Sequence, residues 1–228
     1  MPKIDIRGVI VPDDDLWIYQ WFEMAATAPS MVRSALEAAK GEAVEVLINS
    51  NGGDVFAGNE IYTLLRDYSG KVLIRIQSFA ASAAAIIAMA GESEMSPVAQ
   101  LMIHNVSSRA QGDNRDMEHA AQVLANANQA IAAAFVAKTG KSEAEILDLM
   151  AKETWFTAQR AVSEGFVDRI MFEQAQKAAA PVQLAASYES GLLPNNVIEY
   201  ARTHFNNQTA MANARANYDY LILEVKTK

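Results

Sequence analysis

The chain of 228 residues contains no cysteine. Disulfides, thiolate metal sites and a cysteine nucleophile are therefore excluded. Histidine is scarce as well, with three residues in the chain. Few side chains are thus available that titrate near neutral pH and could act as a base.

The sequence also lacks a long apolar run and an excess of basic charge. The longest apolar stretch, residues 79–90, is too short to span a bilayer and is interrupted by Ser82. The N-terminus has no apolar signal-peptide core and soon turns acidic. A net charge of −8 argues against nucleic-acid binding, which normally needs a basic face. We therefore expect a cytoplasmic protein with neither membrane nor nucleic-acid partners.

Hydrophobic residues make up 51% of the chain and charged residues 20%, enough to bury a sizeable core. The first two-thirds alternate between strand-like and helix-like segments. We expect strands at 3–10, 43–48, 71–77, 100–103 and 166–171, a turn at 49–53, and helices at 30–40, 56–68, 82–90 and 157–164. Such alternation predicts an α/β domain with parallel strands.

A long alanine-rich helix is predicted at 113–138, and its apolar content exceeds what one covered face requires. Ser142 and Glu145 form a capping-box pattern at the start of another helix. The composition changes near the end of the last strand. We divide the chain into a domain at 1–172 and an extension of uncertain order at 173–228, with possible helices at 196–204 and 209–217 and a strand-like segment at 220–225.

Two features could carry chemistry, and each also has a plain structural explanation. Gly52 and Gly53 follow a strand, where exposed N–H groups could form an oxyanion hole, although taken alone a tight turn is the commoner explanation of such a pair. Ser82 lies between alanines at the start of a buried helix, where an N-terminus favours an anion. It is either a nucleophile or an ordinary helix cap. Ser78 is a competing nucleophile.

A serine nucleophile normally needs a base that accepts its proton and an acidic group that orients the base. His104 ends an apolar strand and is either that base or a strand-end histidine bonded to backbone. His119 and His204 are expected to be solvated. Spacing alone does not choose the acid among Asp54, Asp113, Asp116, Asp148, Glu153 and Asp168.

Four segments, in one order, resemble the proteolytic subunit of the Clp protease. Residues 48–62 (INSNGGDVFAGNEIY) are similar to that family's strand, turn and helix containing INSPGG. Residues 78–85 (SFAASAAA) are similar to its nucleophile segment, and residues 101–112 (LMIHNVSSRAQG) to its histidine segment. Residues 153–168 (ETWFTAQRAVSEGFVD) are similar to the segment that supplies its acid.

The resemblance implies that Ser82 is the nucleophile, His104 the base and Glu153, where the family usually has aspartate, the orienting acid. It places oxyanion-hole amides at Gly53 and Ala83 and substrate contact at Gly52. The implied fold is the crotonase-like spiral of ββα units with a long intersubunit handle helix. The family assembles into stacked rings, so a homo-oligomer acting on protein or peptide substrates is implied, with no metal or organic cofactor in the subunit.

Two departures bear on the role. The N-terminal gating segment is short or missing, and more than fifty residues follow the family core. Both resemble Clp-related proteases of tailed phages and prophages, which cleave scaffold and head proteins. A housekeeping subunit working with an ATPase unfoldase is the alternative. A crotonase-type acyl-CoA hydratase or isomerase, a non-enzymatic shell subunit, and a serine–lysine peptidase using Lys71 are further alternatives.

Overall fold

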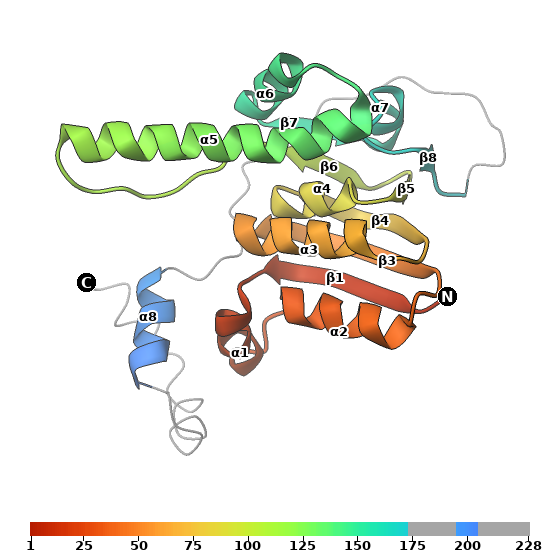
Figure 1. Cartoon of the computed structure of the whole chain (residues 1–228), viewed down its shortest axis with the longest axis horizontal. Helices are drawn as coiled ribbons and strands as arrows, with labels where there is room; N and C mark the ends of the chain where they lie inside the picture. The colour runs from red at the N-terminus through yellow and green to blue at the C-terminus, as the bar shows by residue number, and fades with distance from the viewer. Residues whose placement is uncertain (173–194, 205–228) are drawn as a thin grey trace.

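Eight strands form one sheet in the order β2-β1-β3-β4-β5-β8, and β6 pairs with both β4 and β7. The computed structural model describes residues 1–172 and 195–204 (Figure 1). The strands are β1 (Lys3–Ile10), β2 (Ala26–Thr27), β3 (Val44–Gly53), β4 (Val72–Ala81), β5 (Glu92–Met95), β6 (Gln100–Ile103), β7 (Thr154–Thr157) and β8 (Arg169–Ile170). Every pairing is parallel except that of β6 with β7.

Helices α2, α3 and α4 cover one face of this sheet (Figure 1). The helices are α1 (Asp13–Trp21), α2 (Pro29–Ala39), α3 (Val55–Asp67), α4 (Ala83–Ala88), α5 (Asn114–Thr139), α6 (Glu143–Ala151), α7 (Ala158–Ser163) and α8 (Asn195–His204). Strand–helix–strand succession with parallel pairing confirms the α/β class.

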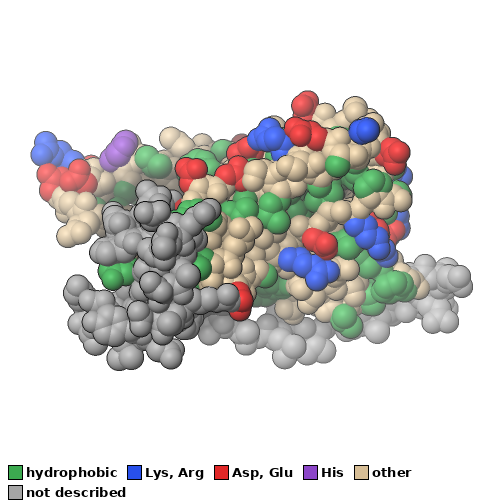
Figure 2. All heavy atoms as spheres, turned by 90° about the horizontal axis from the view of Figure 1, so that it is seen from below, with side chains coloured by type: hydrophobic (Ala, Val, Ile, Leu, Met, Phe, Trp, Pro, Cys, Tyr) green, Lys and Arg blue, Asp and Glu red, His purple; other side chains and the backbone are tan. Residues whose placement is uncertain are grey.

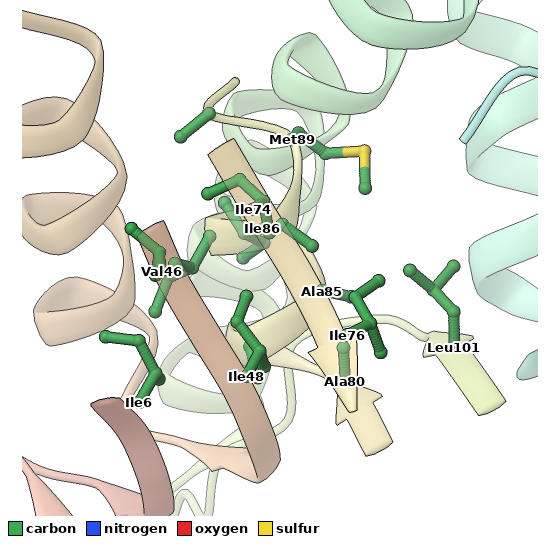
Figure 3. Packing of buried hydrophobic residues seen from close by; sticks show 14 of the residues in the cluster. Ile6, Val46, Ile48, Ile74, Ile76, Ala80, Ala85, Ile86, Met89 and Leu101 are labelled. Carbon is green, nitrogen blue, oxygen red and sulfur yellow. The ribbon is translucent and has the colours of Figure 1, made fainter. Parts of the chain in front are cut away.

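Alternation along the strands separates an apolar face from a charged one. Ile6, Ile48 and Ile76 are fully buried beneath the helices, and Figure 3 shows them packed with α4. Alternate residues, whose side chains point to the opposite face of the sheet, form ion pairs: Arg75 Nη1 lies 2.6 Å from Glu45 Oε1. Because each strand has one apolar and one charged face, a shift of register by one residue would bury charge. The register is therefore fixed, and with it the positions of the strand ends that form the site.

Helix α5 is covered only toward its C-terminal end. Asp113 caps its N-terminus in a capping box, and Gly140 ends it in the left-handed conformation. Ile131, Ala132 and Phe135 are buried near that end, whereas the first half projects past the sheet (Figure 1). Length and apolar composition alone would suit a membrane span, but the caps and the buried end are typical of a globular domain. Figure 2 shows charged and apolar side chains interleaved over the visible face.

A second, smaller cluster joins α8 to the region around α1. Ala201 of α8 is buried together with Val9, Ile18 and Tyr19. The predicted helix at 196–204 is thus confirmed, as Asn195–His204. The predicted helix at 209–217 and strand at 220–225 lie outside the described residues, and the division at residue 172 stays a prediction.

Several local predictions are wrong. The sequence patterns missed α1, β2, β5 and β7. The expected turn at 49–53 belongs to β3, and the last strand is confined to Arg169–Ile170 instead of 166–171. Short strands of two to four residues are set by pairing with neighbours, a signal that periodicity cannot carry.

Candidate active site

Ser82 lies on a sharp turn between β4 and α4. The sequence placed it in the first turn of a helix; it instead precedes Ala83, with φ 55° and ψ −124°. A residue with a Cβ rarely adopts this conformation, which costs roughly 1–3 kcal/mol and is typical of functional positions. The Ser82 N–H is fixed by donating to Met102 O at 3.0 Å. The turn sets the hydroxyl at the end of the strand, as in a nucleophile elbow.

His104 meets this serine because β6 pairs directly with β4. Ala81 lies in register with Met102, so the residues just after the two strands come together. His104 Nε2 lies 2.8 Å from Ser82 Oγ, a hydrogen-bond distance. Burial lowers the pKa of His104, while the Glu153 charge opposes that shift. A neutral imidazole is thereby favoured, which is the form that accepts a proton.

Gly52 lies against the serine turn. Its φ is +91°, and a Cβ there would come within 2.7 Å of Ser82 Cβ and 3.0 Å of Ala83 N. Any side chain would therefore strain the backbone and displace the turn. The Gly52 N–H donates to Ser50 Oγ at 3.1 Å, and that hydroxyl donates to Gly8 O at 2.6 Å.

Gly53 and Ala83 line the same cavity as Ser82 and His104. Ala83 begins α4, so its N–H has no acceptor within the helix. Asp54 N–H donates to Ile10 O on β1. The two predicted oxyanion-hole residues thus border the cavity at Ser82, and their role in an oxyanion hole stays a prediction.

Glu153 lies just before β7, at the end of the turn after α6, with a left-handed φ of 48°. Its charge acts on His104, but no hydrogen bond or ion pair joins the two among residues 1–172. Its Oε1 accepts a hydrogen bond from Trp155 Nε1 at 3.3 Å. The charge of the predicted acid therefore reaches the predicted base, although no hydrogen bond joins the two in residues 1–172.

The other acidic candidates have structural partners. Asp168 Oδ2 accepts from Lys138 Nζ at 2.5 Å and from Ser93 N at 2.7 Å. Asp54 caps α3, Asp113 and Asp116 form the capping box of α5, and Asp148 pairs with Lys152.

The competing nucleophile and the alternative bases lie elsewhere. Ser78 is exposed on β4, four residues before Ser82. Lys71 Nζ pairs with Glu92 Oε2 at 2.7 Å, which leaves a serine–lysine site without support. His119 is exposed on α5, and the side chain of His204 lies outside the described atoms. Residues 1–172 and 195–204 contain no cluster of three metal-binding side chains.

A cavity of about 450 Å³ opens at Ser82 and His104. Its walls come from the start of α3, the segment after β6 and one side of α5, and are mostly apolar, including Phe56, Val106 and Leu124. Phe56 is 76% exposed. An exposed aromatic beside an apolar cavity provides a surface for an apolar side chain of a ligand.

Sequence reasoning missed three supporting residues. Ser50 secures the glycine turn, and Trp155 binds Glu153. Asn128 Oδ1 on α5 accepts the Val106 N–H at 2.7 Å, which fixes the chain two residues after His104. Ser50 had a usable signal, a small hydroxyl residue just before the glycine pair. Asn128 had none, because its partner is distant in sequence.

Comparison with known proteins points to one family. The family model described as Clp protease matches residues 23–174. The ATP-dependent Clp protease proteolytic subunit 1 of Streptomyces avermitilis is 34% identical over 131 residues, which are 56% of this chain and 60% of that protein. The ATP-dependent Clp protease proteolytic subunit of Bacteroides fragilis is 28% identical over 137 residues, 59% of this chain and 66% of that protein. This chain therefore spans less than two thirds of the length of these curated relatives.

The fold has a solved counterpart. The structure of a ClpP1 mutant from Listeria monocytogenes superposes with a TM-score of 0.63 at 21% identity, covering 76% of this chain and 92% of that chain. This likeness concerns the fold, and it confirms the predicted ClpP-like, mostly parallel α/β architecture. The family match extends over most of the described residues and includes Ser82, His104 and Glu153. The chain belongs to the Clp protease family.

Proposed function

We propose that this protein is a serine endopeptidase in which Ser82 attacks the peptide carbonyl and His104 accepts the serine proton. The observation that carries the proposal is the 2.8 Å contact between His104 Nε2 and Ser82 Oγ, formed at a serine held in a strained conformation. Neither a helix cap nor a backbone-bonded histidine requires that contact.

The acylation step follows from this arrangement. Ser82 Oγ forms a bond to the carbonyl carbon while its proton passes to His104 Nε2. The carbonyl oxygen becomes an oxyanion, which the N–H groups of Gly53 and Ala83 stabilise. As the tetrahedral intermediate collapses, the C–N bond breaks and His104 gives its proton to the leaving amine. The products are an acyl-enzyme on Ser82 and a free amino terminus.

Deacylation repeats the sequence with water. His104 takes a proton from a water molecule whose oxygen attacks the ester carbonyl, and the same amides stabilise the second oxyanion. The Ser82–acyl bond then breaks, and His104 returns the proton to Ser82 Oγ. Glu153 stabilises the imidazolium that forms in each step, because a nearby negative charge favours the charged ring.

An acyl-CoA hydratase or isomerase is a weaker candidate. That chemistry also uses paired amides around an oxyanion, but it needs carboxylates placed to move protons at carbon. The acidic side chain lining the cavity in the described chain is Asp54, and its Oδ1 accepts the Ala57 N–H at 2.8 Å. Parallel assays with a fluorogenic peptide and an enoyl-CoA distinguish the two activities.

The substrates and assembly form the finer part of the proposal. We propose a homo-oligomeric ring, since the exposed apolar side chains of α5, including Met117 and Val123, would be covered by a second copy. We further propose cleavage of scaffold and head proteins of a tailed phage or prophage, in the bacterial or infected-host cytoplasm. The support for this role is that more than fifty residues follow the family match, which ends at residue 174, and such an extension resembles the Clp-related proteases of tailed phages.

Regulated turnover with an ATPase unfoldase is the second candidate role, favoured by the ATP-dependent relatives. Incubation of the protein with a scaffold protein, and separately with an unfolded protein plus an ATPase and ATP, distinguishes the roles. Cleavage of folded scaffold without ATP supports head maturation. Cleavage that depends on ATP contradicts it.

The activity itself is tested by fluorophosphonate labelling of the wild type and Ser82→Ala, followed by intact mass. We expect one label per wild-type subunit, located at Ser82 by peptide mapping, and none on the variant. Labelling of the variant at the wild-type rate, or an unlabelled wild type with no peptidase activity, contradicts the proposal. An unlabelled protein that still forms rings would instead indicate a shell subunit.

A further inference from the structure

Glu153 is a poorly restrained side chain for a group that must orient an imidazole. Glutamate has three rotatable side-chain bonds, and this residue is exposed at the protein surface. Its left-handed backbone, with φ 48°, fixes the direction in which the side chain leaves the chain. A further contact is needed to fix the carboxylate itself.

The β6–β7 register brings Glu153 to the right place. Ile103 pairs with Thr154 in the antiparallel ladder. His104 directly follows β6 and Glu153 directly precedes β7, so a continuation of this register brings the two residues opposite one another. Directly opposed residues have neighbouring side chains when both point to one face.

Trp155 provides the missing contact. Its Nε1 donates to Glu153 Oε1 at 3.3 Å, which leaves the second carboxylate oxygen available to another donor. Trp155 is itself held in place: its ring stacks on Phe79 with centroids 5.6 Å apart, and its backbone carbonyl oxygen accepts a hydrogen bond from Arg160 Nη1 at 3.2 Å. Phe79 lies on β4, three residues before Ser82, so one stack links the strand of the serine to the acid.

We propose that Trp155 is a positioning residue, whose indole N–H holds the Glu153 carboxylate on the side of His104 with one oxygen facing the imidazole. This inference rests on the proposed peptidase function. It assigns Trp155 no contact with substrate. Its action passes through the acid, and it therefore disappears when the acid is removed.

The test uses Trp155→Phe, which keeps an aromatic ring beside Phe79 and removes the indole N–H donor. We expect kcat/KM to fall roughly tenfold, the equivalent of one ordinary hydrogen bond, through kcat with KM nearly unchanged. Trp21→Phe is the matched control, since Trp21 lies at the end of α1 beside Phe22 and should retain full activity.

Two further readouts separate positioning from mere packing. In a Glu153→Ala background, Trp155→Phe should have no additional effect, because interacting residues are non-additive. The acidic limb of the pH profile should move to lower pH in Trp155→Phe, because a displaced carboxylate no longer raises the pKa of His104. Asp54, the acidic side chain that lines the cavity, accepts the Ala57 N–H and is not altered in either variant.

Equal loss in both backgrounds, or an unchanged acidic limb, overturns the role of Trp155. So does unchanged activity of Trp155→Phe in the wild-type background. If the wild type and Trp21→Phe are labelled at Ser82, the peptidase proposal stands whichever result Trp155→Phe gives. An unlabelled, inactive wild type contradicts the peptidase proposal and, with it, the role of Trp155.

Discussion

The acidic side chains in the region of Ser82 and in the region of Asp168 differ in how many hydrogen bonds they accept. Asp168 accepts hydrogen bonds from Lys138 Nζ and Ser93 N, and Lys138 also donates to Gly91 O. Near Ser82, by contrast, Glu153 is exposed and has one partner, Trp155. The carboxylate with more hydrogen-bond partners is the one distant from the base. In this protein the carboxylate with several hydrogen-bond partners has a structural role. The candidate site instead contains a carboxylate with few partners and residues in a strained backbone conformation.

The largest separation between the two regions is expected from His104→Ala. Removing the base should lower the rate of fluorophosphonate labelling at Ser82 by about a thousandfold, the scale of general-base catalysis. The melting temperature should change little, because the imidazole is half-buried. Asp168→Asn is the comparison variant. Equal losses of labelling in His104→Ala and Asp168→Asn would contradict the division into a catalytic region around Ser82 and a structural region around Asp168.

Gly52→Ala should come next. The added Cβ would lie 2.7 Å from Ser82 Cβ, and we expect at least about a hundredfold loss of kcat, the effect of losing an oxyanion donor. Gly140→Ala is the matched control, because its φ of +72° gives similar backbone strain with nothing near the new Cβ. Comparable activity in the two variants would refute the close-packing argument.

Asp168→Ala should reduce stability while sparing chemistry. It leaves Lys138, whose side chain is 11% exposed, without its carboxylate partner. We expect a loss of about 1–2 kcal/mol in denaturant unfolding, discounted because the Asp168 side chain is 44% exposed. Labelling per folded molecule should match the wild type. Loss of labelling without loss of stability would place Asp168 in the site.

The pH dependence gives a smaller effect. Burial raises the pKa of Asp168, but the hydrogen bonds from Lys138 and Ser93 and the charge of Lys138 together lower it by more, so the net shift is downward. Its contribution to stability is present above the unfolded carboxyl pKa near 3.9 and is lost as pH falls through the folded pKa. Acid unfolding of Asp168→Asn should consequently be less steep between about pH 4 and the folded pKa.

The corresponding experiment at the site concerns His104. Burial lowers its pKa and Glu153 opposes this, so the acidic limb of kcat/KM should lie below the ordinary histidine value of about 6.5. Glu153→Gln removes the opposing charge, and the limb should move further down while the plateau falls. A limb that moves upward would mean that Glu153 does not act on His104 through its charge.

The smallest effect is expected on the charged face of the sheet. Arg169 pairs with Glu92 and Glu94, and its side chain is 47% exposed. Arg169→Ala should destabilise the protein by less than about 1 kcal/mol, with the difference shrinking at high salt. A larger, salt-independent loss would place these pairs among the stabilising interactions of the core.

Much of the fold could be predicted from periodicity. The strands at residues 3–10 and 100–103, the long helix and its glycine end all follow from alternation and capping patterns. Helix α1 was missed although Pro12 and three aspartates mark its start, because the apolar residues that follow show no clear helical face. Strands β5 and β7 are only four residues long and are defined by their partners.

For the candidate site, sequence supplied the residues but not their geometry. Ser82 reads as a helix-start serine, and nothing local announces its left-handed backbone. The contact with His104 depends on the pairing of β4 with β6, a long-range event. The acid was chosen only by resemblance, because six carboxylates had similar local patterns. Long-range register decides these points, and it is not encoded in a single segment.

The close approach of Gly52 to the serine turn has a genetic consequence. Every single-base missense change of a glycine codon introduces a side chain, and each of these would carry a Cβ into Ser82 and Ala83 N. No single-base missense change at position 52 therefore gives a residue that avoids this clash. In a library selected for proteolysis it should tolerate no substitution, while exposed Arg169 accepts many, so selection alone would distinguish the region of the serine from that of the ion pairs.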